Sequence, residues 1–369
     1  MTSWTRRCEL AGVPRDRCTE HWDYHADAAT ISCEVDVTIG KSLDVLGLKG
    51  TALSDIRDYA QFLKATAGRL YGAEAPRRTV SRCPGCGSDA TAPDAIAVFG
   101  QAYARCGACG HGFVRNQPAA AALDAVFSDS DEHAAVYVDR AGLEVRMTQI
   151  IAPKVEWTLA NYRRLYDAMP RSALDVGAGG GHFVEGLRRR GIDAAGYERS
   201  RSSRQFAKDA FDLTLRDGDF LAAAPERHQL MTFWGLLEYV TEPRRFLEQA
   251  RRCLSSEDGL LIVEIPRLDC FGTAVQRELP DNVARHMDPT SHMNAFTDAS
   301  LATALMETGF RPVAAWYFGM DFYEFLVQAA LRLDEPRVLA ELADLIPTLQ
   351  ASVDQGRQCD DLVIAARPA

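Results

Sequence analysis

Long hydrophobic runs are missing from this chain of 369 residues. No window supplies the roughly 18 consecutive apolar residues that a membrane-spanning helix requires, and residues 1–7 lead into no hydrophobic signal core. We therefore expect a cytoplasmic protein without membrane contact. Hydrophobic residues still make up 47% of the chain, which is enough to bury a sizeable core and excludes wholesale disorder.

Positive charge is also in short supply. The chain has 41 lysine and arginine residues against 51 aspartate and glutamate residues, a formal net charge of -10. A chain with this excess of acid repels polyanions unless a local basic patch overrides the net charge. The composition therefore argues against a nucleic-acid partner.

Cysteine, at ten residues, is too sparse for a disulfide scaffold. Four of the ten fall in two CxxC pairs with 19 residues between the pairs. This spacing is typical of two knuckles that share one tetrahedral zinc ion. Four thiolates fill the coordination sphere of zinc, so we expect the Zn²⁺ to be structural. The predicted ligands are Cys83, Cys86, Cys106 and Cys109.

Changes of composition near residues 76–79 and 116–118 divide the chain into three parts. We predict an N-terminal extension of unknown role (1–78), a zinc ribbon (79–116) and a large C-terminal domain (117–369). In the extension, residues 33–39 alternate apolar and polar side chains as a half-buried strand does, and residues 53–70 repeat apolar side chains at helical spacing. An amphipathic helix in such an extension favours a homodimer.

From residue 173 onward, short apolar runs alternate with helical patterns. This alternation predicts a parallel sheet with helices on both faces, a doubly wound Rossmann-like α/β domain. Residues 360–366 are expected to add a last, antiparallel strand at the edge. The other expected strands are 173–177, 192–198, 230–234 and 259–265, with helices at 183–190, 204–211 and 244–254 between them.

The first of these strands runs into a glycine-rich turn. Asp175 is followed by Gly177, Gly179 and Gly181, and a predicted helix then begins. Closely spaced glycines at this point let the backbone approach a bound nucleotide. The dinucleotide fingerprint G-x-G-x-x-G would need glycine where this chain has His182, which disfavours an NAD oxidoreductase.

The G-x-G-x-G spacing after Asp175 resembles motif I of the class I S-adenosylmethionine (SAM) dependent methyltransferases. The resemblance implies that Asp175 organises the turn and faces the amino-acid portion of SAM. It also implies that Gly177, Gly179 and Gly181 admit this portion of the ligand.

Acids further along the chain extend the resemblance. Glu198 lies 21 residues beyond Gly177, at the end of the second strand, where an acid can accept both ribose hydroxyls. A dinucleotide enzyme would also place an acid there. Asp219 and Phe220 resemble the family's pair that holds the adenine amino group and ring.

Residues 234–243 resemble the family's segment after the fourth strand, written LEHV-x-x-P. Trp234 at its start joins the residues expected to bind the cofactor. Glu238 and Tyr239 are candidate bases, and Tyr239 stands where the family usually has histidine.

The similarity reaches beyond the nucleotide-binding core. A four-cysteine ribbon before motif I, and the H-x-x-x-F-T-x-x-S-L pattern of residues 292–301, resemble bacterial zinc-ribbon methyltransferases, a group that includes deoxysugar C-methyltransferases. This resemblance implies methyl transfer to oxygen or carbon of a small polar acceptor. A sugar nucleotide, a polysaccharide precursor and a natural-product intermediate are the expected classes.

The segment of about residues 266–296 should cover the acceptor, because ligands of such sheets bind beyond the carboxyl ends of the strands. Methyl transfer from a sulfonium needs alignment of the acceptor and, for some acceptors, removal of a proton. Histidine is the natural base near neutral pH. His286 and His292 therefore join Glu238 and Tyr239 as candidate catalytic residues.

Three alternatives stay open. His286, Asp288 and His292 could bind a divalent metal for a catechol-type acceptor. Zinc-binding rRNA methyltransferases also carry cysteine clusters before motif I, although few basic residues flank this ribbon. The chain could also be a non-catalytic scaffold or sensor that binds SAM without turnover.

Overall fold

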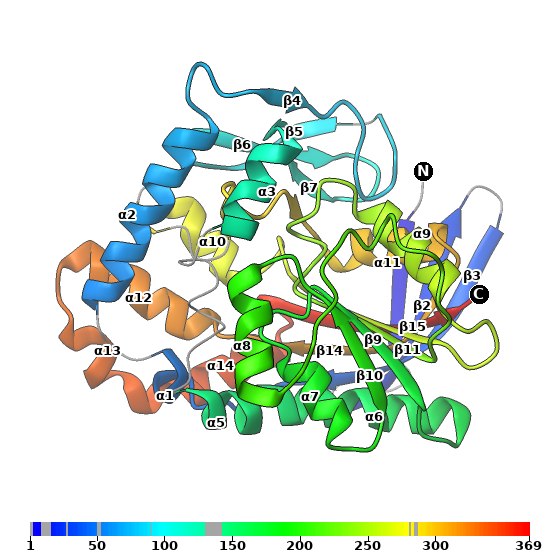
Figure 1. The fold of residues 1–369 in the computed structure, drawn as a ribbon. Coiled ribbons are helices and arrows are strands. Elements are labelled where there is room, and N and C mark those ends of the chain that lie inside the picture. The colour runs from blue at the N-terminus through cyan, green and yellow to red at the C-terminus, as the bar shows by residue number, and fades with distance from the viewer. Residues whose placement is uncertain are drawn as a thin grey trace.

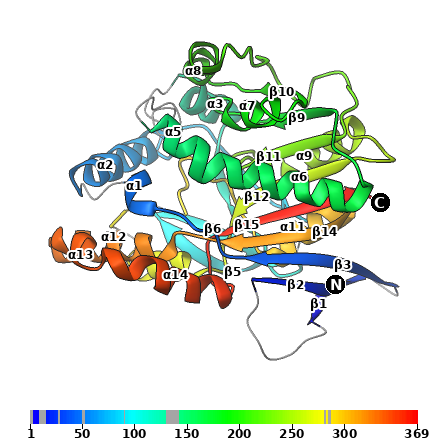
Figure 2. The same ribbon diagram turned by 90° about the horizontal axis from the view of Figure 1, so that it is seen from below.

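The computed structural model describes residues 3–8, 16–26, 29–49, 53–89, 91–129, 142–279, 282–283 and 287–369. A nine-stranded sheet runs through the molecule in the order β1-β2-β3-β14-β15-β12-β11-β9-β10. Helices cover both faces of this sheet (Figures 1 and 2). The α/β fold class predicted from the sequence is confirmed.

Four parallel strands form the nucleotide-binding half of the large sheet. They are β9 (Ser172–Val176), β10 (Asp193–Tyr197), β11 (Leu230–Trp234) and β12 (Leu260–Pro266). β9 pairs with β10 and β11, and β11 pairs with β12. The first three strands are followed by α7 (His182–Arg188), α8 (Arg201–Phe211) and α9 (Pro243–Cys253), close to the expected bounds.

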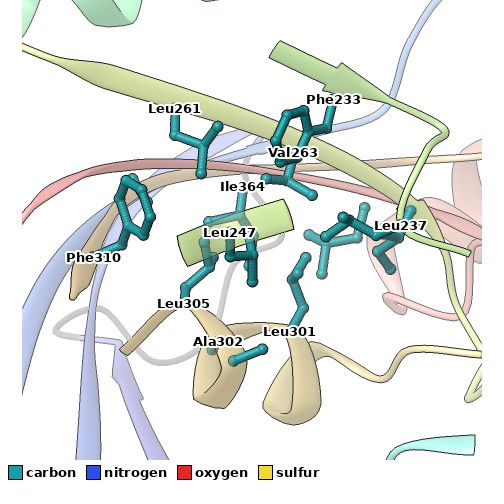
Figure 3. Packing of buried hydrophobic residues seen from close by; sticks show 14 of the residues in the cluster. Phe233, Leu237, Leu247, Leu261, Val263, Leu301, Ala302, Leu305, Phe310 and Ile364 are labelled. Atoms are coloured by element: carbon teal, nitrogen blue, oxygen red, sulfur yellow. The ribbon is translucent and has the colours of Figure 1, made fainter. Parts of the chain in front are cut away.

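Alternation along the strands sends neighbouring side chains into two separate cores. Leu174 of β9 packs in the core beneath α9 and α11 (Asp298–Glu307), whereas Ala173 packs on the opposite face beneath α6 (Ala152–Tyr166) and α7. Figure 3 shows the first core, where Leu247 of α9 and Leu305 of α11 lie beside the sheet. Both faces of the parallel strands are therefore buried.

The last strand, β15 (Asp361–Pro368), is antiparallel as expected but does not form the edge of the sheet. It lies between β12 and β14 (Phe310–Phe318). The edge prediction was wrong because β14 pairs with the side of β15 that faces away from β12, and the N-terminal strands continue the sheet beyond β14. β3 (Ala29–Ile39) pairs with β14 in parallel, and β2 (Arg17–Ala26) and β1 (Ser3–Cys8) continue the sheet.

The N-terminal segment shares its cores with the rest of the chain. Val35 and Val37 of β3 are buried in the same cluster as α9 and α11. Leu63 of α2 (Leu53–Leu70) packs with Tyr103 and Met293, which come from the ribbon and the acceptor-side segment. The division at residues 78 and 116 stays a prediction about domains.

A second sheet links the ribbon to the acceptor-side segment. Its order is β13-β7-β6-β5, so β13 (Asn294–Ala295) of the acceptor-side segment pairs with β7 (Gly112–Val114) of the ribbon. β6 (Gln101–Cys106) and β5 (Thr91–Val98) complete it, and β4 (Arg77–Thr79) pairs with β8 (Asn116–Pro118).

The remaining helices pack around these sheets. They are α1 (Val45–Lys49), α3 (Ala120–Asp129), α5 (Leu143–Arg146), a π-helical turn (Met147–Ile151), α10 (Phe271–Glu278), α12 (Asp321–Leu333), α13 (Arg337–Glu341), a 3₁₀ turn (Ala343–Leu345) and α14 (Ile346–Gln355). Among the described residues, no helix is both long enough and apolar enough to cross a bilayer.

Candidate active site and four-cysteine centre

A cavity of about 1100 Å³ opens at the carboxyl ends of the parallel strands, the edge where ligands of such sheets bind. It is lined by most of the residues that the sequence singled out. Gly181 does not line it, and His286 lies outside the described residues. The singled-out residues that line it are Asp175, Gly177, Gly179, Glu198, Asp219, Phe220, Trp234, Glu238, Tyr239 and His292.

The glycine turn leaves open space at one position only. Gly177, Gly179 and Gly181 all have positive φ, at 78°, 53° and 76°, which side chains rarely adopt. A Cβ on Gly179 would meet no atom within 4 Å, so its backbone is accessible from the cavity. A Cβ on Gly181 would lie 2.7 Å from Leu213 Cδ2, so this glycine serves the packing of the turn.

Glu198 binds the glycine turn directly. Its Oε2 accepts a hydrogen bond from the backbone N–H of Gly179 at 2.7 Å, and its Oε1 accepts one from Ser200 at the same distance. The backbone N–H groups of Gly177 and Ala178 both donate to the carbonyl of Tyr197 at 2.9 Å. The acid at the end of β10 and the turn after β9 are therefore held as one unit.

Asp175 is buried beneath this turn, with 3% of its surface exposed. Burial raises the pKa of its carboxyl to about 7, although a hydrogen bond from Thr232 opposes the rise. The Thr232 hydroxyl donates to Asp175 Oδ1 at 2.6 Å. A single partner on one oxygen leaves this carboxyl able to take further donors.

Asp219 and Phe220 form the wall of the cavity beyond β10. Asp219 Oδ1 accepts the backbone N–H of Leu221 at 2.9 Å, which fixes the loop. The buried Phe220 ring packs edge-on against Tyr197, with 6.0 Å between ring centres. An aromatic surface beside an acid is suited to a flat, nitrogen-rich ring.

Lys154 is a cavity residue that sequence reasoning missed. It comes from α6, its Nζ lies 2.6 Å from Glu264 Oε2, and it sits 4.5 Å from the centre of the Trp234 ring. Periodicity in the sequence does not say which residue of a helix meets the strand ends. Its position follows only from the packing of α6 against the sheet.

Glu238, the one carboxylic acid among the candidate bases, is buried, with 3% of its surface exposed. Burial raises the pKa of its carboxyl to about 8, and the nearby Glu264 and Asp361 act in the same direction, while Lys154 opposes them. Its neighbour Tyr239 places its ring edge-on to His292, with 4.9 Å between ring centres. Three of the candidate bases thus line one cavity.

Some buried polar atoms of the cavity residues have no partner. Within the described part of the chain, His182 Nε2, Trp234 Nε1 and Glu238 Oε2 make no hydrogen bond. Buried polar groups are nearly always satisfied in folded proteins. Their presence around one cavity is the pattern expected of a site that binds a polar ligand.

The carboxylate of Asp288 accepts hydrogen bonds within a local turn. It accepts from the backbone N–H and hydroxyl of Thr290 and from the hydroxyl of Ser291. Among the described residues, the four cysteines are the one group of metal-ligating side chains that gathers closely enough for an ion. The alternative of a divalent metal at Asp288 and His292 therefore gains no support from the described residues.

The four-cysteine centre forms as the spacing predicted. The thiol sulfurs of Cys83, Cys86, Cys106 and Cys109 all lie within 4.8 Å of one another. Two of the separations are 3.7 Å, between Cys83 and Cys109, and 3.6 Å, between Cys86 and Cys106. Zinc–sulfur bonds of about 2.3 Å in a tetrahedron place sulfurs about 3.8 Å apart, so the cluster fits a zinc site.

Residues 153–315 match the model of a family described as a methyltransferase domain. This range begins in α6 and ends in β14, and it contains the glycine turn and the acids that line the cavity. The chain contains a class I SAM-dependent methyltransferase domain. The ribbon and β1–β3 lie outside the matched range of this methyltransferase.

Solved structures that resemble part of this chain include methyltransferases and a [4+2]-cyclase, SpnF. The plantazolicin methyltransferase BamL is 14% identical with a TM-score of 0.45, over 67% of this chain and 94% of its own. Magnesium protoporphyrin IX methyltransferase from Synechocystis PCC 6803 is 12% identical with a TM-score of 0.45, over 67% and 98%. No curated protein matches the methyltransferase significantly. Similarity at this level transfers no substrate and no residue role.

Proposed function

We propose that this methyltransferase moves the methyl group of SAM to oxygen or carbon of a small polar metabolite. A sugar nucleotide, a polysaccharide precursor or a natural-product intermediate would be the acceptor. The observation that carries the proposal is the cavity of about 1100 Å³, because the glycine turn with its acids and three candidate bases open into the same space.

The residues around the turn fit the cofactor. Gly179 leaves its backbone accessible, and the acids Asp175 and Glu198 line the same cavity. Asp219 and Phe220 would hold the adenine, Glu198 the ribose, and Asp175 the amino-acid portion. The unpartnered indole N–H of Trp234 supplies a further donor. SAM, when bound, supplies a methyl group on a sulfonium, whose departure as a thioether needs no acid.

The remaining task of the protein is to align the acceptor and to take up a proton. Burial raises the pKa of Glu238 to about 8, so near neutral pH its carboxyl is available to donate a hydrogen bond to a ligand rather than to accept a proton. His292 is half-buried beside Tyr239 and is the base that this proposal favours among the described candidates. His286 remains a candidate from the sequence.

The four-cysteine centre supports a structural zinc ion in this proposal. Four thiolates complete a tetrahedron and leave no position for an activated water. The cluster is also outside the residues that line the cavity. The ion would therefore contribute stability and shape to the ribbon, and the chemistry would be left to the cavity.

The test is transfer of label from methyl-tritiated SAM into a fractionated extract of the source cell, with metabolites, RNA and protein separated before counting. We expect label in the small-metabolite fraction, and mass spectrometry would then identify the acceptor. Label in RNA would overturn the acceptor class. Intact SAM binding without label in any fraction would favour the scaffold or sensor alternative.

A further inference from the structure

The ribbon and the cavity are connected through Asn294, a fully buried residue in the strand β13. Its side-chain amide Nδ2 donates to the carbonyl of Leu237 at 3.0 Å and to the carbonyl of Val240 at 2.6 Å. Its backbone N–H donates to the carbonyl of Glu238 at 3.0 Å. One residue therefore binds three carbonyls of the segment that carries Glu238 and Tyr239.

The same amide is fixed from the ribbon side by His111. Asn294 Oδ1 lies 3.0 Å from His111 Nε2. Because Nδ2 faces two carbonyls, which only accept, Oδ1 must be the acceptor and His111 Nε2 must carry the hydrogen. All the donor atoms of the Asn294 amide and its acceptor are thus in use.

His111 in turn contacts both of the loops that carry the cysteine pairs. It follows Cys109 by two residues, and its backbone carbonyl accepts the N–H of Cys106 at 2.8 Å. A Cβ built on Gly85, between the first two cysteines, would lie 3.0 Å from the His111 ring. The position of this imidazole is therefore set by the loops that hold the four thiols.

We propose that Asn294 is a positioning residue that holds residues 236–242 in their catalytic arrangement, using the ribbon as its anchor. The proposal rests on the proposed function, because it concerns how Glu238 and Tyr239 meet the acceptor. The ribbon holds neighbouring residues as well: Tyr103 Oη donates to the carbonyl of His292, and the N–H of Val114 donates to Met293. The ribbon thereby also holds His292, which lines the cavity beside Tyr239.

We expect Asn294 to affect the rate of methyl transfer and not the binding of SAM. The hydrogen bonds described for the glycine turn run to Glu198 and to Tyr197 of β10, and those described for Asn294 run to other residues. Loss of the Asn294 amide should therefore leave SAM affinity nearly unchanged and lower the rate of transfer. Alignment of reacting groups is sensitive to displacements of about 1 Å.

The test compares Asn294→Asp with Asn161→Asp. The first change places a second acceptor against the carbonyls of Leu237 and Val240, whereas Asn161 is a similarly buried amide that donates to Trp157 within α6. Asn294→Ser provides a milder change if the aspartate variant folds poorly. Each protein is measured for bound zinc, SAM affinity, amide hydrogen exchange, and label transfer into the metabolite fraction per SAM site.

In both Asn294 variants we expect zinc to be retained and SAM affinity to stay within about threefold of wild type. Exchange in residues 236–242 should rise at least about tenfold while exchange in residues 177–181 is unchanged, and transfer should fall at least about tenfold, as the loss of buried hydrogen bonds implies. Asn161→Asp should show none of these changes in the loop.

Unchanged exchange in residues 236–242 would overturn the proposal, as would an unchanged transfer rate. Zinc loss or unfolding in both Asn294 variants, with Asn161→Asp intact, would assign Asn294 a purely structural role and overturn it equally. If wild type itself transfers no label, the proposed function fails, and the exchange and affinity data still decide whether Asn294 holds the loop.

Discussion

At the scale of single residues, two carboxyl groups that line the cavity are buried and have raised pKa values. Asp175 and Glu238 are each 3% exposed, and burial raises their pKa values to about 7 and about 8. Water stabilises the charged form of a carboxyl more than a protein interior does. Both groups therefore hold a proton for part or most of the time near neutral pH.

The raised pKa of Glu238 predicts a pH-dependent stability. Between its ordinary value of 4.5 and about 8, the folded protein keeps a proton that the unfolded chain has released, so stability falls as pH rises through this window. Glu238→Gln cannot titrate and should reduce the loss of unfolding free energy between pH 5 and pH 8 by roughly 1–4 kcal/mol. Asp175 titrates with the same sign, so part of the slope should remain.

Urea denaturation at the two pH values measures this effect. Glu248→Gln on the exposed face of α9 is the control, and it should keep the slope of wild type. Equal slopes in Glu238→Gln and wild type would show that the folded protein holds no extra proton at Glu238.

His292→Ala tests the candidate base at the same scale. We expect SAM affinity near wild type, because His292 lies with Tyr239 rather than at the glycine turn, and a loss of transfer of about 10²–10⁴-fold. Calorimetry and label transfer measure the two quantities. His25→Ala, whose imidazole bonds Thr5 and Thr30 on the N-terminal strands, should change neither. Full activity of His292→Ala would move the base to Tyr239, Glu238 or His286.

At the scale of elements, the site is built from turns at strand ends, and these were largely readable from the sequence. The turn after β9 and the two cysteine knuckles depend on residues close together in the chain, so spacing alone predicted them. Lys154 beside Trp234, and β13 beside β7, bring together residues far apart in the chain. Such contacts depend on tertiary packing, which local periodicity does not encode.

The ribbon gives a prediction at this scale. Cys86→Ser should lower bound zinc and the melting temperature together, because a thiolate ligand is lost from a site whose binding energy contributes to folding. Metal analysis and thermal denaturation measure both quantities. Cys253→Ser changes a buried cysteine of α9 outside the cluster and should retain zinc. A stable Cys86→Ser protein with one equivalent of zinc would refute the structural ribbon.

At the scale of the whole molecule, the N-terminal strands and the methyltransferase domain share one sheet and one core. The sequence predicted a strand near residues 33–39, but its partner β14 lies almost 280 residues later. Pairing between strands so far apart in the sequence leaves no pattern in the residues around either strand. The sequence therefore predicted the N-terminal extension as a separate part of the chain. In the structure, Val35 and Val37 pack in the same cluster as Leu247 and Leu305.

A core mutation in β3 should therefore weaken the whole methyltransferase. Val35 is fully buried, and Val35→Ala should lower the free energy of unfolding by about 2 kcal/mol in one transition that also abolishes SAM binding. Thr30→Ala, on an exposed position of the same strand, should leave the transition unchanged. Calorimetric scans with and without SAM distinguish one transition from two, and a separate N-terminal transition would show that the segment folds independently.

The account depends most on the claim that the cavity at the strand ends holds SAM. Titration calorimetry of SAM into wild type, Asp175→Ala and Asp193→Ala tests this claim most directly, because Asp193 is an exposed acid at the opposite end of β10 from the turn. We predict wild-type affinity for Asp193→Ala and a loss of about 10–100-fold for Asp175→Ala, the cost of removing a hydrogen-bonded carboxyl from a polar site. Unchanged affinity in Asp175→Ala would contradict the assignment of the glycine turn as the cofactor site.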